Sequence, residues 1–130
     1  MILNEDVLND LSSRAKASER LRASMDLRTT PNDSSQRVLN ALEPGTIVPI
    51  HRHRSTTEVV VMLRGRIKES LYDNDGHLIE SFIVEAGGIN SGFSLSIGQW
   101  HTTECLESGT VFLECKDGAY EPLGEEDIMR

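Results

Sequence analysis

The sequence has little cysteine, no long apolar run and no excess of positive charge, and each absence excludes a class of protein. Two cysteines, Cys105 and Cys115, are too few for a disulfide framework, so we expect reduced thiols. No apolar run approaches the roughly 18 residues that a membrane helix needs. The first residues, MILNEDVLND, are acidic where a signal peptide is basic. We therefore expect a cytoplasmic protein with no membrane partner.

The net charge of −8 argues against general binding to nucleic acid. The charge is uneven, because residues 104–130 hold eight acids against two bases, so the rest of the chain can present local basic surface. Guanidinium groups there could clamp a phosphate or a carboxylate. The main cationic residues in question are Arg20, Arg22, Arg28, Arg37, Arg64, Arg66 and Lys68. For any single arginine, solvation or pairing with the acidic end of the chain is the simpler interpretation.

The pattern of apolar residues changes along the chain. Residues 4–18 predict a helix, because apolar side chains recur at helical spacing and acids crowd the first turn. From about residue 36, short runs rich in β-branched and aromatic residues alternate with turn signals, which is typical of an all-β sandwich or small barrel. Asn74-Asp75-Gly76 predicts a hairpin turn.

We expect the 130 residues to form a single domain. Its predicted parts are an N-terminal helix with a lead-in strand (1–35), a β-barrel (36–118) and a C-terminal tail (119–130). The tail is acidic and contains proline, so we expect it to be a solvated surface segment.

Three of the four histidines belong to one candidate metal site. His51 and His53 stand one residue apart, and side chains at i and i+2 of a strand share a face. Glu58 follows them after a short polar link, and His101 is a fourth candidate far along the chain. Imidazoles with one carboxylate suit a first-row metal such as Fe, Mn, Ni, Cu or Zn. Because an isolated H-x-H is often just a pair of surface histidines, the surrounding spacing decides.

That spacing resembles the cupin superfamily. The first cupin motif is matched in full by Gly45, five residues, His51, one residue, His53, four residues, Glu58, six residues and Gly65. The second motif is matched at Gly98 and His101. Asn90, Ser96 and Cys105 stand where that motif has glycine, proline and asparagine.

The segments QRVLNALEPGTIVPIHRHRSTTEVVVMLRGRI and GQWHTTECLESGTVFLECKDGAYEPL resemble one branch of that superfamily, the WbuC-type cupin-fold metalloproteins. The resemblance implies an all-β cupin fold, a double-stranded β-helix or jelly-roll barrel, with an N-terminal α-helix. It implies one divalent metal bound by His51, His53, Glu58 and His101.

The branch has no assigned reaction. Together with the four-ligand set and the supply of arginines, the resemblance leads us to expect a metal-dependent enzyme, of isomerase, epimerase or oxygenase type, that acts on a small polar metabolite. A sugar or sugar nucleotide in polysaccharide (O-antigen type) biosynthesis is the expected substrate. The alternatives are a non-catalytic module in which the metal anchors a small molecule, and an Fe(II)-dependent oxygenase. A fold hosts many functions, so this part of the prediction is an analogy.

Seven further residues are candidates for contacting the substrate or supporting the metal ligands. They are Arg64, Lys68, Tyr72, Gln99, Cys105, Glu114 and Tyr120. Proton transfer would need a base among them, but the register of the hairpin around residues 107–109 is ambiguous by one residue, which leaves the facing of Glu114 open. We expect a small ligand, anionic or sugar-like. We also expect a homodimer, because cupins commonly pair through sheet edges or outer faces and the N-terminal segment offers spare apolar residues.

Overall fold

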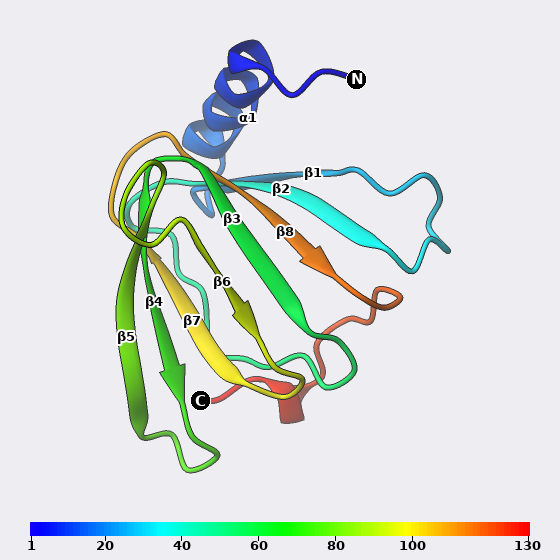
Figure 1. Ribbon diagram of the computed structural model, residues 1–130, viewed down its shortest axis with the longest axis vertical. Coiled ribbons are helices and arrows are strands. Elements are labelled where there is room, and N and C mark those ends of the chain that lie inside the picture. The colour runs from blue at the N-terminus through cyan, green and yellow to red at the C-terminus, as the bar shows by residue number, and fades with distance from the viewer.

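Two antiparallel sheets face each other in the computed structural model, which describes residues 1–130, and one helix packs outside them (Figure 1). The larger sheet has the strand order β1-β2-β8-β3-β6 and the smaller one β5-β4-β7. This arrangement confirms the all-β prediction. The elements are α1 (Glu5–Ala17), β1 (Arg22–Asp26), β2 (Gln36–Leu42), β3 (Glu58–Arg64), β4 (Arg66–Tyr72), β5 (Leu78–Glu85), β6 (Gly92–Leu95), β7 (Trp100–Cys105), β8 (Thr110–Lys116) and the 3₁₀ turn η1 (Glu125–Asp127).

Helix α1 confirms the helix predicted over residues 4–18. The Asn4 side chain accepts the backbone N–H of Val7 at 3.2 Å, which satisfies one of the free donors at the helix start. The buried face of α1 packs on the outer side of the large sheet, in a cluster of Leu8, Leu11, Ala15, Leu39, Ala41 and Val111. Neither α1 nor η1 has the length and apolar character that crossing a membrane requires.

A second apolar cluster fills the space between the sheets. Its members are Leu42, Val60, Met62, Ile67, Val84, Cys105 and Phe112. On β7, Cys105 lies in this core, and His101 lies four residues earlier on the same face. The core therefore occupies one end of the barrel and leaves the other end to polar side chains.

The predicted hairpin at Asn74-Asp75-Gly76 is confirmed. Strands β4 and β5 pair antiparallel on either side of it, and the Gly76 N–H donates to the Asp73 carbonyl at 3.1 Å. Gly76 has φ +84°, a left-handed backbone conformation that residues other than glycine rarely adopt.

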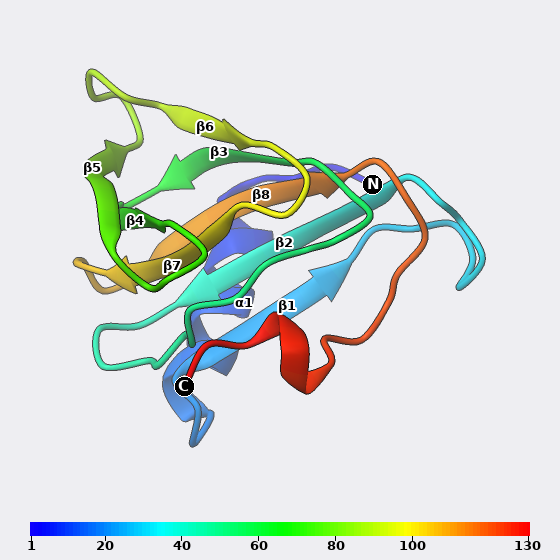
Figure 2. The same cartoon turned by 90° about the horizontal axis from the view of Figure 1, so that it is seen from below.

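The C-terminal segment, residues 119–130, is mostly exposed at the surface, but its last residues are attached to the barrel. Figure 2 shows that it folds back beside the sheets. The Met129 N–H donates to the Ile50 carbonyl at 2.8 Å, and the Arg52 N–H donates to the Asp127 carbonyl at 3.0 Å. The Asp127 carboxylate also pairs with the guanidinium groups of Arg52 and Arg54, at 3.1 and 2.6 Å. Acids that look like a solvated tail in the sequence thus attach this segment beside the histidines.

Candidate metal centre

The structure brings the H-x-H pair and His101 together. His51 and His101 exchange backbone hydrogen bonds of 3.0 and 2.9 Å, so the start of β7 holds the segment that carries the pair. The ring centroids of His51 and His101 lie 4.4 Å apart, and those of His53 and His101 lie 6.1 Å apart. One ring nitrogen from each of the three lies within 4.8 Å of the others, which is close enough to share one ion.

Glu58, the first residue of β3, completes the cluster that the sequence predicts. Its Oε2 atom lies 3.3 Å from His101 Nε2 and 3.8 Å from His53 Nε2. Glu58 Oε2 and His101 Nε2 are both buried, and apart from facing each other at 3.3 Å neither has a hydrogen-bond partner. Buried polar atoms without partners are costly, and a cation between them would satisfy both. The donor set therefore fits a divalent transition metal.

Two hydrogen bonds orient the imidazole rings. His101 Nδ1 donates to Glu69 Oε1 at 2.6 Å, and the Thr103 hydroxyl donates to Glu69 Oε2 at 2.6 Å. His51 Nδ1 lies 2.8 Å from the Pro49 carbonyl, to which it can only donate. In both rings the proton on Nδ1 makes Nε2 the nitrogen that would bind a metal, an arrangement common to metal-binding histidines.

Burial and neighbouring charge set the protonation of the three histidines. Burial lowers the pKa of His51 to about 4, with a contribution from His101. Burial, helped by the charge of Lys116, lowers the pKa of His53 to about 4. Burial alone would lower the pKa of His101 too, but Glu58 and Glu69 outweigh it and raise this pKa to about 9. Two imidazoles are therefore neutral at pH 7, and the third holds a proton that a metal would have to displace.

A second carboxyl group, Glu114, lies beside Glu58. Burial raises the pKa of Glu114, and the nearby charge of Glu58 raises it further, while Lys116 lowers it. The Lys116 ammonium donates to Glu114 Oε1 at 2.9 Å. Burial also raises the pKa of Glu58, but contacts with Glu114 and His101 outweigh it and hold this pKa below its usual range. The pair thus contains one carboxylate that stays charged and one that exchanges a proton more easily near neutral pH.

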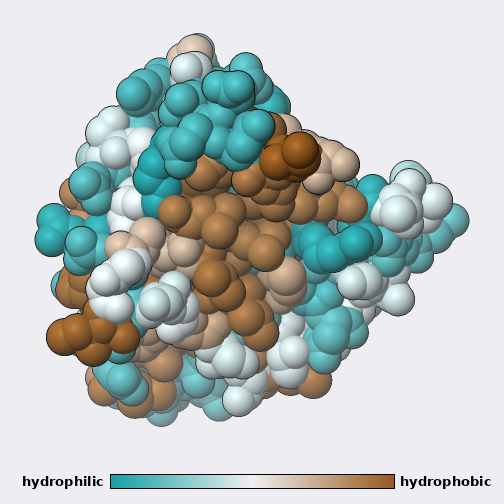
Figure 3. All heavy atoms as spheres, turned by 45° about the horizontal axis from the view of Figure 1, so that its top comes forward, coloured by the Kyte–Doolittle hydropathy of each residue, from teal (hydrophilic) through white to brown (hydrophobic).

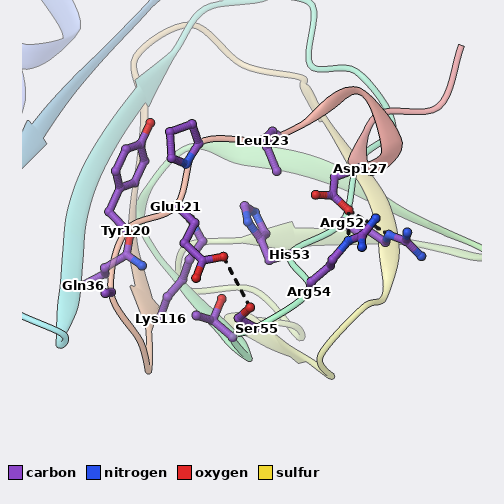
Figure 4. Close-up of a pocket in the computed structure, with 13 residues that line it drawn as sticks. Gln36, Arg52, His53, Arg54, Ser55, Lys116, Tyr120, Glu121, Leu123 and Asp127 are labelled. Carbon is purple, nitrogen blue, oxygen red and sulfur yellow. Dashed lines mark hydrogen bonds and ion pairs between the residues drawn. The ribbon is translucent and has the colours of Figure 1, made fainter.

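The three histidines line a cavity of about 370 Å³, and Glu114 and Lys116 line it as well. Its further lining residues are Arg20, Arg22, Asn40, Leu42, Val48, Pro49, Thr103, Phe112, Leu123 and Ile128. A second cavity of about 220 Å³ adjoins it, and His53, Lys116 and Leu123 line both. Figure 4 shows His53 among residues of the C-terminal segment, with Asp127 reaching Arg52 and Arg54. The candidate site is therefore open to a small ligand on the side of the C-terminal segment.

Among the other predicted candidates, the structure places Glu114 in this cavity. The ambiguity of register is resolved by the pairing of β8 with β3, where Glu114 lies opposite Val60 and Lys116 opposite Glu58. Tyr120 lies in the adjoining cavity and is 61% exposed, with the Arg28 guanidinium 5.8 Å above its ring.

The remaining five candidates lie outside the histidine cavity. Arg64 lies under α1, where its guanidinium donates to backbone and side-chain oxygens of that helix. Lys68 and Tyr72 alternate with the inward-facing Glu69, so they point away from the cavity.

Gln99 and Cys105 are held by backbone groups. Gln99 Nε2 donates to the carbonyls of Tyr72 and Trp100. Cys105 is buried in the core, where its thiol donates to the Leu42 and Glu107 carbonyls. Both cysteines are free thiols, as expected.

Sequence reasoning missed Glu69 and Thr103, although a signal for Glu69 was present. In RIKESLY, Ile67, Glu69 and Leu71 share one face of a strand, and an acid between two apolar residues on an inward face needs a partner. The pairing of β4 with β7 places Glu69 opposite Thr103 and Leu71 opposite His101. The partner itself could not be read from the sequence, because it depends on that register.

Comparisons with known proteins agree with this fold. Residues 3–84 match a family model described as a domain of unknown function, DUF6016. None of the curated protein sequences compared with the chain matches it.

Several solved structures have a similar fold. An oxalate oxidase in complex with glycolate gives a TM-score of 0.65 at 16% identity, over 80% of this chain and 54% of that chain. The capsular polysaccharide assembling protein CapF from Staphylococcus aureus gives 0.68 at 18% identity, over 81% of this chain and 28% of that one. A mutant of the oxalate decarboxylase OxdC from Bacillus subtilis gives 0.57 at 23% identity, over 75% and 25%.

This chain spans about half or less of each of these proteins. At such low identity the likeness concerns the fold alone. The shared fold is the cupin fold, which confirms the fold that the motif spacing predicts.

Proposed function

The chain belongs to the DUF6016 family, a domain of unknown function, and we propose that it is a single-domain cupin metalloprotein that binds one divalent transition metal. The proposed ligands are His51, His53, Glu58 and His101. The observation that carries the proposal is the buried pair Glu58 Oε2 and His101 Nε2, which face each other at 3.3 Å with no other hydrogen-bond partner, beside two neutral imidazoles. Nitrogen and carboxylate ligands of this kind suit Fe, Mn, Ni, Cu or Zn.

The metal site supports an enzyme more than a purely structural site. A bound divalent metal would polarise an oxygen of a ligand or lower the pKa of a bound water. Glu114 faces the same cavity with a raised pKa, so it can accept or return a proton there. Lys116 holds the Glu114 carboxyl group in place. Glu69 and Thr103 hold His101 in the orientation that a metal ligand needs.

We further propose that the substrate is a small polar metabolite such as a sugar or sugar nucleotide, in polysaccharide (O-antigen type) biosynthesis. The WbuC-type resemblance supports this, and so does the similar fold of CapF, a capsular polysaccharide assembling protein. The two free cysteines favour a cytoplasmic location. The alternatives are a non-catalytic module and an Fe(II)-dependent oxygenase. Thermal-shift screening of the metal-loaded protein against nucleotide sugars, and activity in air with Fe(II) alone, distinguish them.

Replacement of one proposed ligand tests the metal site directly. We expect His101→Ala to lose most of its bound metal and to keep its fold, because the apolar clusters that stabilise the sheets do not include His101. Elemental analysis of protein purified without added metal measures the content. Metal should raise the melting temperature of the wild type and not of the variant.

His77→Ala is the matched control, since the His77 side chain is 78% exposed in the β4–β5 turn. The neighbouring Asp73 carboxylate already accepts the backbone N–H groups of Asp75 and His77, so this turn is satisfied without an ion. Equal metal content in the two variants would remove His101 from the site and with it the proposed ligand set.

A further inference from the structure

Two arginines without partners line the same cavity as the three histidines. Neither Arg20 nor Arg22 forms a side-chain hydrogen bond or an ion pair, although the protein carries a net charge of −8. Five other arginines do have a carboxylate partner, namely Arg28, Arg37, Arg52, Arg54 and Arg64. The remaining three, Arg14, Arg66 and Arg130, are also unpaired but lie outside this cavity. A protein with surplus carboxylates therefore leaves two guanidinium groups unpaired at the edge of the candidate metal site.

The backbone between these arginines is held in an unusual conformation. Leu21 has φ +57°, in the left-handed region of the backbone that residues other than glycine rarely adopt. No other non-glycine residue of the chain has a positive φ. Its N–H donates to the Ser18 carbonyl at 3.0 Å, and its carbonyl accepts the Glu43 N–H at 2.9 Å. The Thr46 hydroxyl donates to the Arg20 carbonyl at 2.7 Å. Strain of this kind persists only where the surroundings hold it, and it is concentrated at functional sites.

The register of β1 directs Arg22 toward the cavity. Arg22 lies opposite Leu42 of β2, and Leu42 lines the cavity. The next residue, Ala23, lies opposite Ala41 and packs with the cluster under α1 on the other face. Alternation along the strand therefore places Arg22 on the concave face of the sheet.

The charges that line the cavity favour an anion. The only acid in its lining is Glu114, and this carboxyl group is already bonded to Lys116. Glu58 lies deeper, against His101. The two guanidinium groups are thus the uncompensated charges of the lining, and guanidinium forks match carboxylate and phosphate oxygens.

The size and neutral groups of the cavity narrow the ligand further. A volume of about 370 Å³ is near the lower end for small-molecule sites, which run from about 300 to 1,000 Å³. The side-chain amide of Asn40, opposite Phe112 in the register of β2 and β8, lines the cavity without a hydrogen bond to the protein. It is free to bind a hydroxyl group.

We propose that the cavity binds a hydroxylated anion of monosaccharide size, a sugar acid or a sugar phosphate, whose anionic group is clamped by Arg20 and Arg22. A hydroxyl or carbonyl oxygen of the same molecule faces the histidines. This inference rests on the proposed function, because it takes the cavity to be the substrate side of the metal site. It narrows the proposed substrate class from polar metabolites to small anionic sugars.

The test compares Arg22→Gln with Arg66→Gln in metal-loaded protein by isothermal titration calorimetry. Arg66 is an exposed arginine without an ion pair at the start of β4, outside the cavity, so its replacement changes the net charge equally. The probes are glucuronate, glucose 6-phosphate and neutral glucose. For at least one of the two anions we expect binding about tenfold or more weaker in Arg22→Gln, and unchanged in Arg66→Gln. The anion that binds identifies the carboxylate or the phosphate as the recognised group.

Elemental analysis and circular dichroism of the same samples separate the possible failures. Full metal content and unchanged spectra in Arg22→Gln show that only the clamp was removed. A wild type that holds metal but binds neither anion at millimolar concentration overturns the inference and leaves the proposed metal site standing. Equal affinities in the two variants also overturn it. A wild type without metal that still binds an anion through Arg22 supports the clamp and overturns the metal site instead.

Discussion

Glu69 shows how a single buried carboxylate can set the behaviour of the whole site. It is fully buried and has two partners, His101 and Thr103. Its charge, together with that of Glu58, raises the pKa of His101 although burial opposes this. The same hydrogen bond leaves Nε2 of His101 directed at Glu58. One side chain therefore orients a proposed metal ligand and, with Glu58, sets its protonation.

Metal affinity should consequently depend on pH. Below pH 9, His101 holds a proton that metal binding must displace, so affinity falls as pH falls. We expect affinity to rise by at least about tenfold per pH unit between pH 6 and 8, because His101 releases one proton per metal bound and Glu114, with its pKa raised to about 7 beside Glu58, can release part of a second. His51 and His53, each with a pKa of about 4, are already neutral in this pH range, so they do not add to the change of metal affinity with pH. Calorimetry in buffers of different ionisation enthalpy counts the released protons.

Glu69→Gln provides the internal comparison. The substitution keeps the shape of the side chain and removes one of the two charges that raise the pKa of His101, so the dependence of metal affinity on pH should shift to lower pH. Glu80→Gln, at an exposed position on β5 of the same sheet, should leave the dependence of metal affinity on pH unchanged. A wild type whose affinity is flat between pH 6 and 8 would contradict the assigned protonation of His101.

Among the elements, the C-terminal segment of residues 119–130 is held by a few polar contacts. Asp127 receives the guanidinium groups of both Arg52 and Arg54, and the backbone of this segment bonds to residues 50–52. Few apolar side chains support these contacts. Two of the apolar residues of the segment, Leu123 and Ile128, line the histidine cavity. Segments of this kind open locally at lower free energy than the core.

Asp127→Asn should loosen this segment without unfolding the barrel. The substitution removes the charge that pairs with both arginines, so we expect faster hydrogen exchange at Arg52 and Met129, whose N–H groups bond across the contact. Exchange in β3 and β8 should stay unchanged. Glu126→Gln is the matched control, because the Glu126 side chain is 64% exposed and lies 3.9 Å from Arg54. The same protection in both variants would show that Asp127 does not hold the segment.

At the scale of the whole molecule, one face of the large sheet is covered by α1 only in part. Helix α1 contacts β1, β2 and β8, while the outer side of β3 exposes Val59, Val61 and Leu63 to the extent of 38–43%. The first three residues of the chain, which are apolar, are exposed as well. Figure 3 shows a broad apolar area in the middle of the face that it displays. Exposed apolar areas of this kind mark interaction surfaces.

We propose that this surface makes the protein a homodimer, and light scattering at micromolar concentration tests it. Val61→Glu should shift the mass toward the monomer, because a charge would then lie within the apolar contact. Ile83→Glu is the control, since Ile83 is also 43% exposed but lies on β5 of the other sheet. A wild type of monomeric mass would contradict the proposal. Dissociation by both changes alike would place the contact elsewhere.

Local patterns in the sequence predicted much of the fold. The Asn4 cap and the spacing of Leu8, Leu11 and Ala15 are properties of neighbouring residues, so α1 could be read directly. The Gly76 turn is local in the same way. The attachment of the C-terminal segment could not be predicted, because it depends on ion pairs between Asp127 and Arg52 and Arg54. These arginines lie more than seventy residues earlier in the chain.

The sequence by itself determined which residues could bind a metal, since the spacing of His51, His53 and Glu58 is a property of one short segment. It also determined the alternation along each strand. Only the tertiary structure decided which face of a strand is the inner one, because that depends on the register between strands far apart in the chain. This register brings Glu69 to His101, turns Glu114 inward and leaves Arg22 unpaired beside the histidines. Charge, hydrogen bonding and pKa follow from neighbours in space, and folding chooses those neighbours.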